Sequence, residues 1–179
     1  MSAPVVVRDS ADSDLAAIQA IYAHHVEHGF GSFEEVPPSL AEMAERRSGV
    51  LARGLPYLAA QSEGTVLGYA YASAFRPRAA YRYSLEDSIY VAPDAAGRGI
   101  GRLLLSALLA RAEAWGARQM VAVIGDTGNL GSIGLHTALG FRMVGVLEGV
   151  GYKRGRWVDS VTMQRVLGSG ASAPPQEAR

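Results

Sequence analysis

The sequence predicts a single α/β (α+β) domain built on a mixed central sheet of about seven strands, and three observations lead to this fold class. Short β-branched and aromatic stretches alternate with helical stretches along the chain. A turn at 62–64 and a loop over Gly151–Arg156 each join two adjacent strand-like stretches, which predicts antiparallel pairs. Between them, a strand leads through a glycine-rich loop and a leucine-rich helix into another strand, which predicts a parallel crossover. The elements follow the order β-α-α-β-β-β-α-β-α-β-β.

The elements expected before the central strand are a strand, two helices and a hairpin, over Val5–Arg8, Asp14–Glu27, Leu40–Arg53, and Tyr57–Gln61 with Val66–Ala74. Apolar residues recur at helical spacing in the first helix. Ser39 and Glu42 form a capping box at the start of the second helix. The turn at 62–64 joins the strands of the hairpin, so the early part of the sheet is antiparallel. The intervening stretch Gly29–Pro38 is expected to be a loop, with Phe33 in a pocket wall.

The central stretch is a strand over Ser84–Val91 followed by a helix over Ile100–Trp115. Pro93 ends the strand, and Gly97, Gly99 and Gly101 lead into the helix. Glycines let backbone N–H groups approach a ligand, and a helix start adds unpaired donors and a positive dipole end, so a phosphate or pyrophosphate site is expected here. The alternative is a turn that only lets the helix pack closely.

Two familiar nucleotide motifs do not fit this loop. The P-loop requires Gly-Lys-Ser/Thr, which does not follow. The dinucleotide fingerprint requires a third glycine where this chain has Arg102, and it belongs to the first strand rather than to the middle of the chain. The spacing alone therefore indicates an anion site without naming the ligand.

The last third predicts a strand, a short helix and two further strands, over Gln119–Ile124, Ser132–Leu139, Phe141–Gly149 and Trp157–Val166. Loops are expected at Gly125–Gly131 and at Gly151–Arg156, and the stretch Gly151–Trp157 is a candidate lid or interface segment. Residues 1–167 form the one expected domain. The tail 168–179 is small, polar and proline-containing, and is expected to be disordered.

Composition excludes several classes of protein and site. The chain has 17 basic and 17 acidic residues, so it lacks the basic excess of a nucleic-acid-binding protein. It has no cysteine, which excludes disulfides, thiolate metal sites and a cysteine nucleophile. No signal peptide and no membrane span is expected, and a cytoplasmic protein is the default interpretation. Near-zero net charge favours self-association.

Two clusters of side chains carry open alternatives. His24, His25 and His28 end the first helix, where they either cap the helix or line a cleft mouth. A metal site is disfavoured because no carboxylate stands between His24 and His28 at the position that the HExxH pattern requires. The loop Phe75–Tyr83 contains three arginines. It is either a solvated loop or a site of anion recognition, because guanidinium groups pair bidentately with carboxylate, phosphonate or phosphinate.

Several stretches together resemble a known family. The order of elements and the loop AAGRGIGR resemble the GNAT superfamily of N-acetyltransferases. RAAYRYSLEDSIYV, VAVIGDTGNLGSIGLHTALGF and GYKRGRWVDSVTMQ resemble its phosphinothricin and methionine sulfoximine N-acetyltransferase branch. The likeness covers roughly residues 5–167. It implies the GNAT fold and an enzyme that transfers an acetyl group from acetyl-CoA to the amine of a small amino-acid analogue, by direct attack on the thioester.

The resemblance also assigns the residues that bind acetyl-CoA. The strand before the loop would supply backbone groups to the pantetheine arm, and the loop amides would bind the pyrophosphate. Ala96 stands where the family has Gln or Arg, which removes one side-chain contact to a phosphate. The residues implied are Ile89, Tyr90, Val91, Gly97, Arg98, Gly99, Ile100, Gly101, Arg102 and Asn129; no metal is implied.

For catalysis the resemblance implies Glu86 as general base and His136 as the acid that protonates the leaving thiolate. A base is required because an amino-acid amine is mostly protonated at pH 7. Strand alternation puts Glu86 and Asp87 on opposite faces, so only one of them is expected to face the cleft. The alternatives are a surface ion pair for Glu86 and an ordinary helix histidine for His136. Backbone N–H groups near Tyr90 and Val91 are candidates for an oxyanion hole.

The acceptor site and the partners follow from the same resemblance. Phosphinothricin, methionine sulfoximine and methionine sulfone are the candidate acceptors, and a homodimer and a role in herbicide resistance are implied. Two other functions stay open: acetylation of another small amine or a protein N-terminus, and a non-catalytic acyl-CoA-binding module. Side chains expected to contact the acceptor are Phe33, Arg76, Arg78, Tyr81, Arg82 and Glu86.

Overall fold

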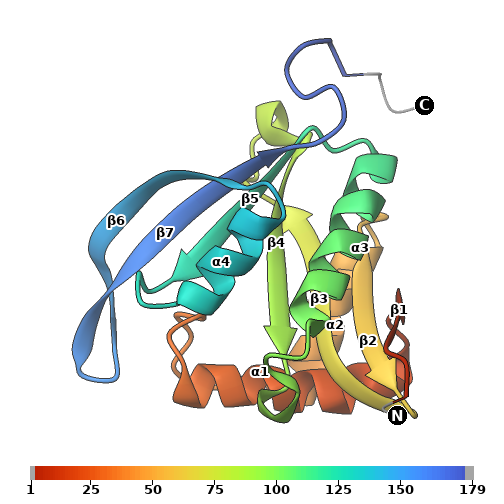
Figure 1. Ribbon diagram of the computed structural model, residues 1–179, viewed down its shortest axis with the longest axis vertical. Coiled ribbons are helices and arrows are strands. Elements are labelled where there is room, and N and C mark those ends of the chain that lie inside the picture. Colours follow the sequence, from red (N-terminus) through yellow and green to blue (C-terminus); the bar gives the residue numbers. More distant parts are fainter. Residues whose placement is uncertain (1–2, 176–179) are drawn as a thin grey trace.

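The computed structural model describes residues 3–175 and contains one seven-stranded sheet in the order β1-β2-β3-β4-β5-β7-β6 (Figure 1). Only β4 and β5 pair in parallel; the other neighbours are antiparallel. The predicted α/β class, mixed sheet and single parallel crossover are confirmed. The strands are β1 (Val6–Asp9), β2 (Tyr57–Ser62), β3 (Thr65–Ala74), β4 (Ser84–Val91), β5 (Gln119–Gly125), β6 (Arg142–Lys153) and β7 (Arg156–Val166).

Helices cover both faces of the sheet. In Figure 1, α3 (Ile100–Trp115) and α4 (Leu130–Ala138) lie in front of it, and α1 (Leu15–His28) and α2 (Leu40–Leu51) lie behind. α3 packs on β2, β3 and β4 through leucines that are fully buried, among them Leu104, Leu105 and Leu108. Each such side chain contributes about 1.5–3 kcal/mol of transfer free energy. This packing fixes the start of α3 beside the end of β4.

The two central strands part half-way along their length. β4 and β5 pair only over Ser84–Asp87 and Gln119–Ala122, although β4 continues to Val91 and β5 to Gly125. Beyond Asp87, the backbone N–H and C=O groups of β4 no longer form hydrogen bonds with those of β5. The sheet therefore opens beside the start of α3, and backbone polar groups border the opening.

Short 3-10 turns account for small differences from the predicted boundaries. Asp14, predicted to begin the first helix, instead ends a 3-10 turn that starts at Asp12. Its carboxylate binds Arg8 at 2.7 Å and accepts the Ala11 backbone N–H at 2.7 Å, which holds this turn ahead of α1. A similar turn, Ala79–Tyr81, lies within the predicted arginine-containing loop. α2 ends two residues earlier than predicted.

β6 departs most from the prediction. The expected strand ended at Gly149, but β6 continues to Lys153, so the predicted loop over Gly151–Arg156 is wrong. Gly149 has φ of +58°, and the pairing register with β7 shifts between Leu147 and Gly151. This glycine therefore belongs to an irregularity that bends the strand without ending it. The β6–β7 hairpin turns at Arg154 and Gly155 instead.

The C-terminal segment after β7 has no helix or strand as far as residue 175. Arg118 donates to the carbonyls of Gly170 at 3.4 Å and Pro174 at 3.2 Å. The expected disorder of the tail stays a prediction, and its last part, 176–179, lies outside the described residues. Within residues 3–175, no helix has the length and apolar character needed to cross a bilayer.

Candidate active site

A cavity of about 720 Å³ lies where β4 and β5 part. It extends from the glycine-rich loop before α3 to the first turns of α4 and the segment that follows α1. The structure therefore brings together residues as far apart in the chain as His25 and Ser160. The predicted site residues in its wall are Phe33, Glu86, Ile89, Tyr90, Val91, Gly97, Gly99, Ile100, Gly101, Arg102, Asn129 and His136.

The glycines of the loop serve two different purposes. Gly97 and Gly99 have φ of +74° and +78°, and a Cβ added to either would meet no atom within 4 Å. They are required for backbone conformation and leave open space in front of the backbone. Gly101 instead packs closely, because its Cβ would lie 3.2 Å from the Leu135 side chain of α4. Close packing of the helix thus accounts for Gly101, whereas backbone conformation accounts for Gly97 and Gly99.

The start of α3 presents unpaired donors to the cavity. The first α3 amide that bonds back along the chain is that of Leu103, which donates to the Gly99 carbonyl at 3.2 Å. The amides of 100–102 precede it and have no acceptor within the helix. They lie at the positive end of the helix dipole and in the cavity wall. This geometry fits a pyrophosphate, which needs several N–H donors and positive potential.

His25 borders the same cavity from α1. Its Nε2 lies 2.8 Å from the carbonyl oxygen of Val91, at the end of β4. A carbonyl only accepts, so Nε2 carries the proton. Burial lowers the pKa of His25, and the charge of His24 lowers it further, against the opposing effect of the Val91 carbonyl. The alternative of a histidine at a cleft mouth is therefore confirmed for His25, while His28 bonds back to the His24 carbonyl.

Glu86 reaches the cavity from β4, where it pairs with Ser73 of β3 and is half-buried. Burial raises the pKa of Glu86, and the negative charge of neighbouring Asp87 raises it further. A carboxyl group with a raised pKa is a stronger proton acceptor once it is ionised. Glu86 thus has the position and the electrostatics that a general base requires.

His136, on α4, borders the cavity although it is only 2% exposed. Its Nε2 is 2.9 Å from Asp87 Oδ2, and its Nδ1 is 2.7 Å from the Ser132 carbonyl oxygen. Burial lowers the pKa of His136, but the hydrogen bond and charge of Asp87, together with the Ser132 carbonyl, raise it above its ordinary value. Both nitrogens are therefore engaged by groups that favour the protonated ring.

The prediction that only one of the adjacent carboxylates faces the cleft is wrong. Glu86 and Asp87 do point to opposite faces of β4, yet both border the cavity. The reason is that the cavity passes through the sheet, because β4 and β5 separate directly after Asp87. Asp87 is 6% exposed, and its second oxygen, Oδ1, has no hydrogen-bond partner among the residues that the structure describes.

The segment after α1 forms the wall that contains Phe33. A Cβ on Gly125 would lie 1.9 Å from the Phe30 carbonyl, and one on Gly151 would lie 2.6 Å from the Phe33 ring. Both glycines therefore let this segment pack directly on β5 and β6. Phe33 remains 42% exposed and lines the cavity, as predicted.

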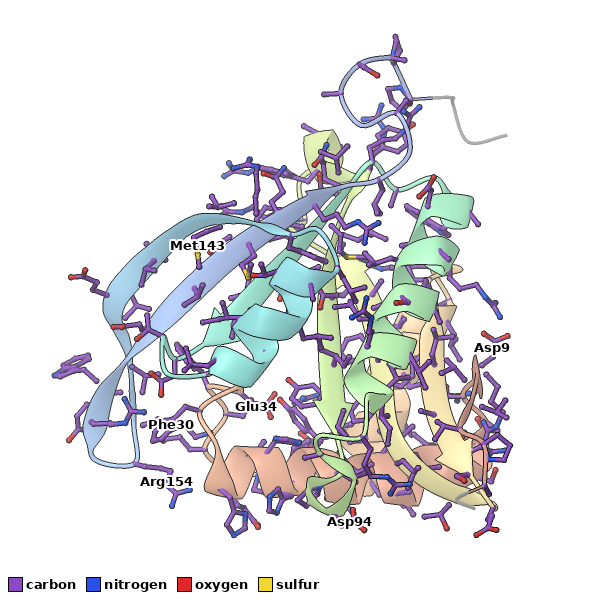
Figure 2. The ribbon with its side chains drawn as sticks, viewed as in Figure 1. Asp9, Phe30, Glu34, Asp94, Met143 and Arg154 are labelled. Atoms are coloured by element: carbon purple, nitrogen blue, oxygen red, sulfur yellow. The ribbon has the colours of Figure 1, made fainter. Side chains whose placement is uncertain are left out.

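The β6–β7 hairpin holds this segment from the outside. Lys153 is 3% exposed and donates to the Ser32 carbonyl at 2.7 Å, and the Arg156 guanidinium stacks on the Phe30 ring at 3.8 Å. Burial lowers the pKa of Lys153, and the charge of Arg154 lowers it further. Figure 2 shows Phe30 and Arg154 beside the end of the hairpin. The predicted lid segment is thus an ordered strand end packed on the cavity wall.

Some predicted site residues lie outside the cavity wall. Arg98 is exposed on the glycine-rich loop. The arginine-containing loop is exposed as well, and Arg76 stacks on its own neighbours Phe75 and Tyr81. The Phe75 N–H donates to the Ser84 carbonyl at 3.2 Å, which ties the loop to β4 two residues before Glu86. The residues concerned are Arg76, Arg78, Tyr81, Arg82 and Arg98, none of which borders the cavity.

Sequence reasoning missed Asp87 and Ser132, and it named His25 only as one of three histidines. Ser132 borders the cavity, and its hydroxyl lies 3.4 Å from His136 Nδ1. Ser132 precedes His136 by four positions on the same helix, and this spacing could have indicated that the two side chains are neighbours. The contact between Asp87 and His136 spans 49 positions, and no local pattern reveals it. Among residues 3–175, no three side chains of the metal-ligating types form a group that could hold an ion.

Comparison with known proteins fits this geometry. The model of the acetyltransferase (GNAT) family matches residues 18–141. The chain belongs to this family. It is 56% identical to a phosphinothricin N-acetyltransferase of Alcaligenes faecalis, over 95% of this chain and 86% of the relative. It is 41% identical to an L-methionine sulfoximine/L-methionine sulfone acetyltransferase of Pseudomonas paraeruginosa, over 94% of this chain and 98% of the relative.

A solved structure agrees in fold and in ligand class. A GNAT superfamily phosphinothricin acetyltransferase from Sinorhizobium meliloti, in complex with acetyl-CoA, superposes with a TM-score of 0.94. It is 50% identical, and the match covers 99% of this chain and 95% of that one. The GNAT fold and the family implied by the sequence motifs are therefore confirmed.

Proposed function

We propose that this GNAT protein transfers the acetyl group of acetyl-CoA to the amine of a small amino-acid analogue of the phosphinothricin, methionine sulfoximine or methionine sulfone type. One observation carries the proposal. A single cavity contains a set of amides suited to a pyrophosphate at one end and a half-buried carboxyl group, Glu86, near the point where the sheet opens. The names of the relatives supply the acceptor class.

The cavity fits acetyl-CoA at both ends. The pyrophosphate would accept from the amides of 97–102, and Arg102 would add positive charge. The peptide-like pantetheine arm would pair with the backbone of Ile89, Tyr90 and Val91, as a strand pairs with a sheet edge. Asn129, whose Oδ1 caps α4 by accepting the Ser132 N–H at 3.2 Å, borders the same path. When bound, acetyl-CoA supplies the thioester.

Glu86 is the general base of this proposal. Its raised pKa brings its proton affinity nearer to that of an amine at neutral pH, so it takes a proton from the acceptor ammonium directly or through one water. Backbone N–H groups near Tyr90 and Val91 stabilise negative charge that develops on the carbonyl oxygen. His136, whose contacts with Asp87 and the Ser132 carbonyl favour the protonated ring, is the source of the proton for the departing thiolate.

The acceptor lies on the side of the cavity that Phe33 closes. The arginine-containing loop joins β4 two residues before Glu86, and its guanidinium groups are the proposed partners of the acceptor's carboxylate or phosphinate. Tyr81 packs edge-on to Phe75 at 5.8 Å in this loop. Anion recognition by Arg76, Arg78 and Arg82 would select an acidic amino-acid analogue over a neutral amine.

We also propose that the protein is a cytoplasmic homodimer. An apolar surface covers the sheet edge formed by β6 and the start of β7, and each of its members is at least 41% exposed. Large exposed apolar patches are typical of protein interfaces, and an edge strand offers unpaired backbone groups as well. Figure 2 shows Met143 on this edge. The β6 apolar surface consists of Met143, Val144, Val146, Leu147, Val150, Tyr152 and Trp157.

A thiol-release assay with a panel of amines tests the proposed function. The panel contains phosphinothricin, methionine sulfoximine, methionine sulfone, simple amines and an alanine-terminated peptide. Acetylation of the amino-acid analogues without acetylation of the peptide supports the proposal, and it would give the protein a part in herbicide resistance. Preference for the peptide indicates an N-terminal acetyltransferase. Acetyl-CoA binding in calorimetry with no turnover on any amine indicates a binding module.

A further inference from the structure

His136 borders the cavity, but both nitrogens of its ring are already engaged by protein groups. The side chain is 2% exposed, Nε2 is held by Asp87 and Nδ1 by the Ser132 carbonyl. A proton that leaves this ring for a bound thiolate therefore requires an intermediate carrier.

The hydrogen bonds fix the protonation of the ring. The Ser132 carbonyl can only accept, so Nδ1 carries a proton. A second proton lies between Nε2 and Asp87 Oδ2, which are 2.9 Å apart. Asp87 Oδ1 has no partner within the described part of the chain, so the His136 N–H is the donor that compensates the charge of this buried carboxylate. The arrangement favours an imidazolium–carboxylate pair.

The Ser132 hydroxyl connects this pair with the cavity. Its Oγ lies 3.4 Å from Nδ1, close enough to share the Nδ1 proton with the Ser132 carbonyl after a small movement. Ser132 is only half-buried and lines the cavity. A hydroxyl can accept one proton while it donates another, which a carbonyl cannot do. Ser132 is therefore suited to carry a proton from the buried ring to a ligand.

We propose that Ser132, His136 and Asp87 form a proton-delivery chain to the thiolate leaving group, with Ser132 as a catalytic residue and Asp87 as a positioning residue. The inference rests on the proposed function. As the C–N bond forms and the C–S bond breaks, the bonding electron pair stays on sulfur. The Ser132 hydroxyl gives its proton to sulfur and takes the Nδ1 proton of His136. The ring, now neutral, keeps the Nε2 proton that it donates to Asp87. It regains a proton on Nδ1 from solvent.

The same three residue types form the catalytic triad of hydrolases, but here the proton moves from histidine to serine and not from serine to histidine. A triad histidine removes the serine proton with an unprotonated nitrogen. In this protein the nitrogen next to serine is a donor, because it also bonds to a carbonyl. Ser132 is therefore not activated as a nucleophile. The chain delivers protons and does not create an acyl-enzyme.

Asp87 is the charged group that most affects the protonation of the His136 ring. Phe141 packs edge-on to His136 at 4.8 Å. β5, which packs on α4, has the sequence QMVAVIG and brings no charged side chain. Arg165 of β7 binds the Leu139 carbonyl at the far end of the helix. Glu86 lies on the opposite face of β4. Replacement of Asp87 should therefore change the charge of the ring more than any other single substitution.

Steady-state kinetics of Ser132→Ala test the serine. We expect kcat to fall about tenfold, less than the usual contribution of about 10²–10⁴-fold from general acid catalysis because thiolates leave readily, while the Kd of acetyl-CoA in calorimetry stays unchanged. The decline of kcat at alkaline pH, where His136 loses its proton, should disappear. Thr137→Ala is the matched control, since it removes a hydroxyl from the same helix that donates to Ile133 and lies outside the cavity. Wild-type kcat with the alkaline decline retained in Ser132→Ala would overturn the proposal.

Nitrogen NMR of the histidine rings tests Asp87 without any turnover. Signals of His136 are assigned with His136→Gln, and the ring should be cationic at pH 7 in the unmodified protein and neutral in the isosteric Asp87→Asn. A ring that stays cationic in Asp87→Asn refutes the role of Asp87. Absence of turnover on every amine in the unmodified protein refutes the proposed function, and proton delivery with it. Turnover that Ser132→Ala leaves unchanged refutes the chain alone.

Discussion

Two adjacent carboxylates acquire different chemistry from their positions on one strand. Glu86 lies half-buried on the face of β4 toward α1, and burial and the charge of Asp87 both raise its pKa. Asp87 points to the face covered by α3 and α4, where it binds the ring of His136. The strand's alternation separates the two groups, and the opening in the sheet gives both access to one cavity. Neighbouring residues can therefore take part in two separate proton transfers of the proposed reaction.

Replacement of Glu86 by glutamine should lower kcat/KM by about 10²–10⁴-fold near neutral pH, which is the usual contribution of a general base. In the unmodified protein, kcat/KM should fall as the pH drops through the raised pKa of Glu86, because the carboxyl group then gains a proton. This acidic decline should be absent in the variant. The loss should also shrink at high pH, where the acceptor amine is already neutral.

The pH dependence of kcat/KM for both proteins checks this prediction. Glu45→Gln is the control, because Glu45 is exposed on α2 and lies outside the cavity. Glu86→Gln with unmodified activity at pH 7 would show that another group removes the proton.

At the scale of elements, the strand, glycine-rich loop and helix were predictable because each is specified locally. Proline and glycine end β4, and leucines at helical spacing define α3. The opening between β4 and β5 was not predictable, since it depends on pairing between strands that are far apart in the chain. The extension of β6 was also missed, because Gly149 reads as the end of a strand whereas the register shift carries the strand past it.

Gly99→Val should weaken acetyl-CoA binding at least tenfold. A side chain at φ of +78° strains the backbone and enters the space in front of the loop amides. Gly64→Val is a close control, since Gly64 has the same φ of +78° and the same open surroundings but lies in the β2–β3 turn. Calorimetry with acetyl-CoA should separate the two variants. Equal affinities would contradict the assignment of the loop.

Gly125→Ala should destabilise the protein by about 1–3 kcal/mol, the usual effect of overpacking. The added Cβ would lie 1.9 Å from the Phe30 carbonyl, so the segment with Phe33 must move away from β5. The KM for the amine should rise as well, because this segment forms the cavity wall.

Thermal unfolding compares Gly125→Ala with Gly49→Ala. Gly49 lies within α2 and has no atom within 4 Å of its ideal Cβ, so alanine there should raise Tm through better helix propensity. A Gly125→Ala variant with unchanged Tm and KM would mean that the segment is not held against β5.

At the scale of the molecule, the two edges of the sheet differ. β1 forms one edge and is only four residues long, whereas β6 forms the other edge over twelve residues and carries most of the β6 apolar surface. A long apolar edge strand is a site of association unless it is covered. The sequence indicated self-association only through near-zero net charge and family resemblance. The β6 apolar surface could not be predicted from the sequence, because it depends on the continuation of β6 past Gly149, which adds Val150 and Tyr152 to it.

Leu147→Glu should convert the proposed dimer into a monomer. Leu147 is 60% exposed within the β6 apolar surface, and a pair of buried carboxylates related by two-fold symmetry would oppose association. Sedimentation should give twice the 18.9 kDa chain mass for the unmodified protein and the single-chain mass for the variant. Val6→Glu is the matched control: Val6 is 53% exposed on β1, at the opposite edge of the sheet. A dimer that survives Leu147→Glu but dissociates in Val6→Glu would place the interface at β1. A monomeric unmodified protein would refute the proposed dimer.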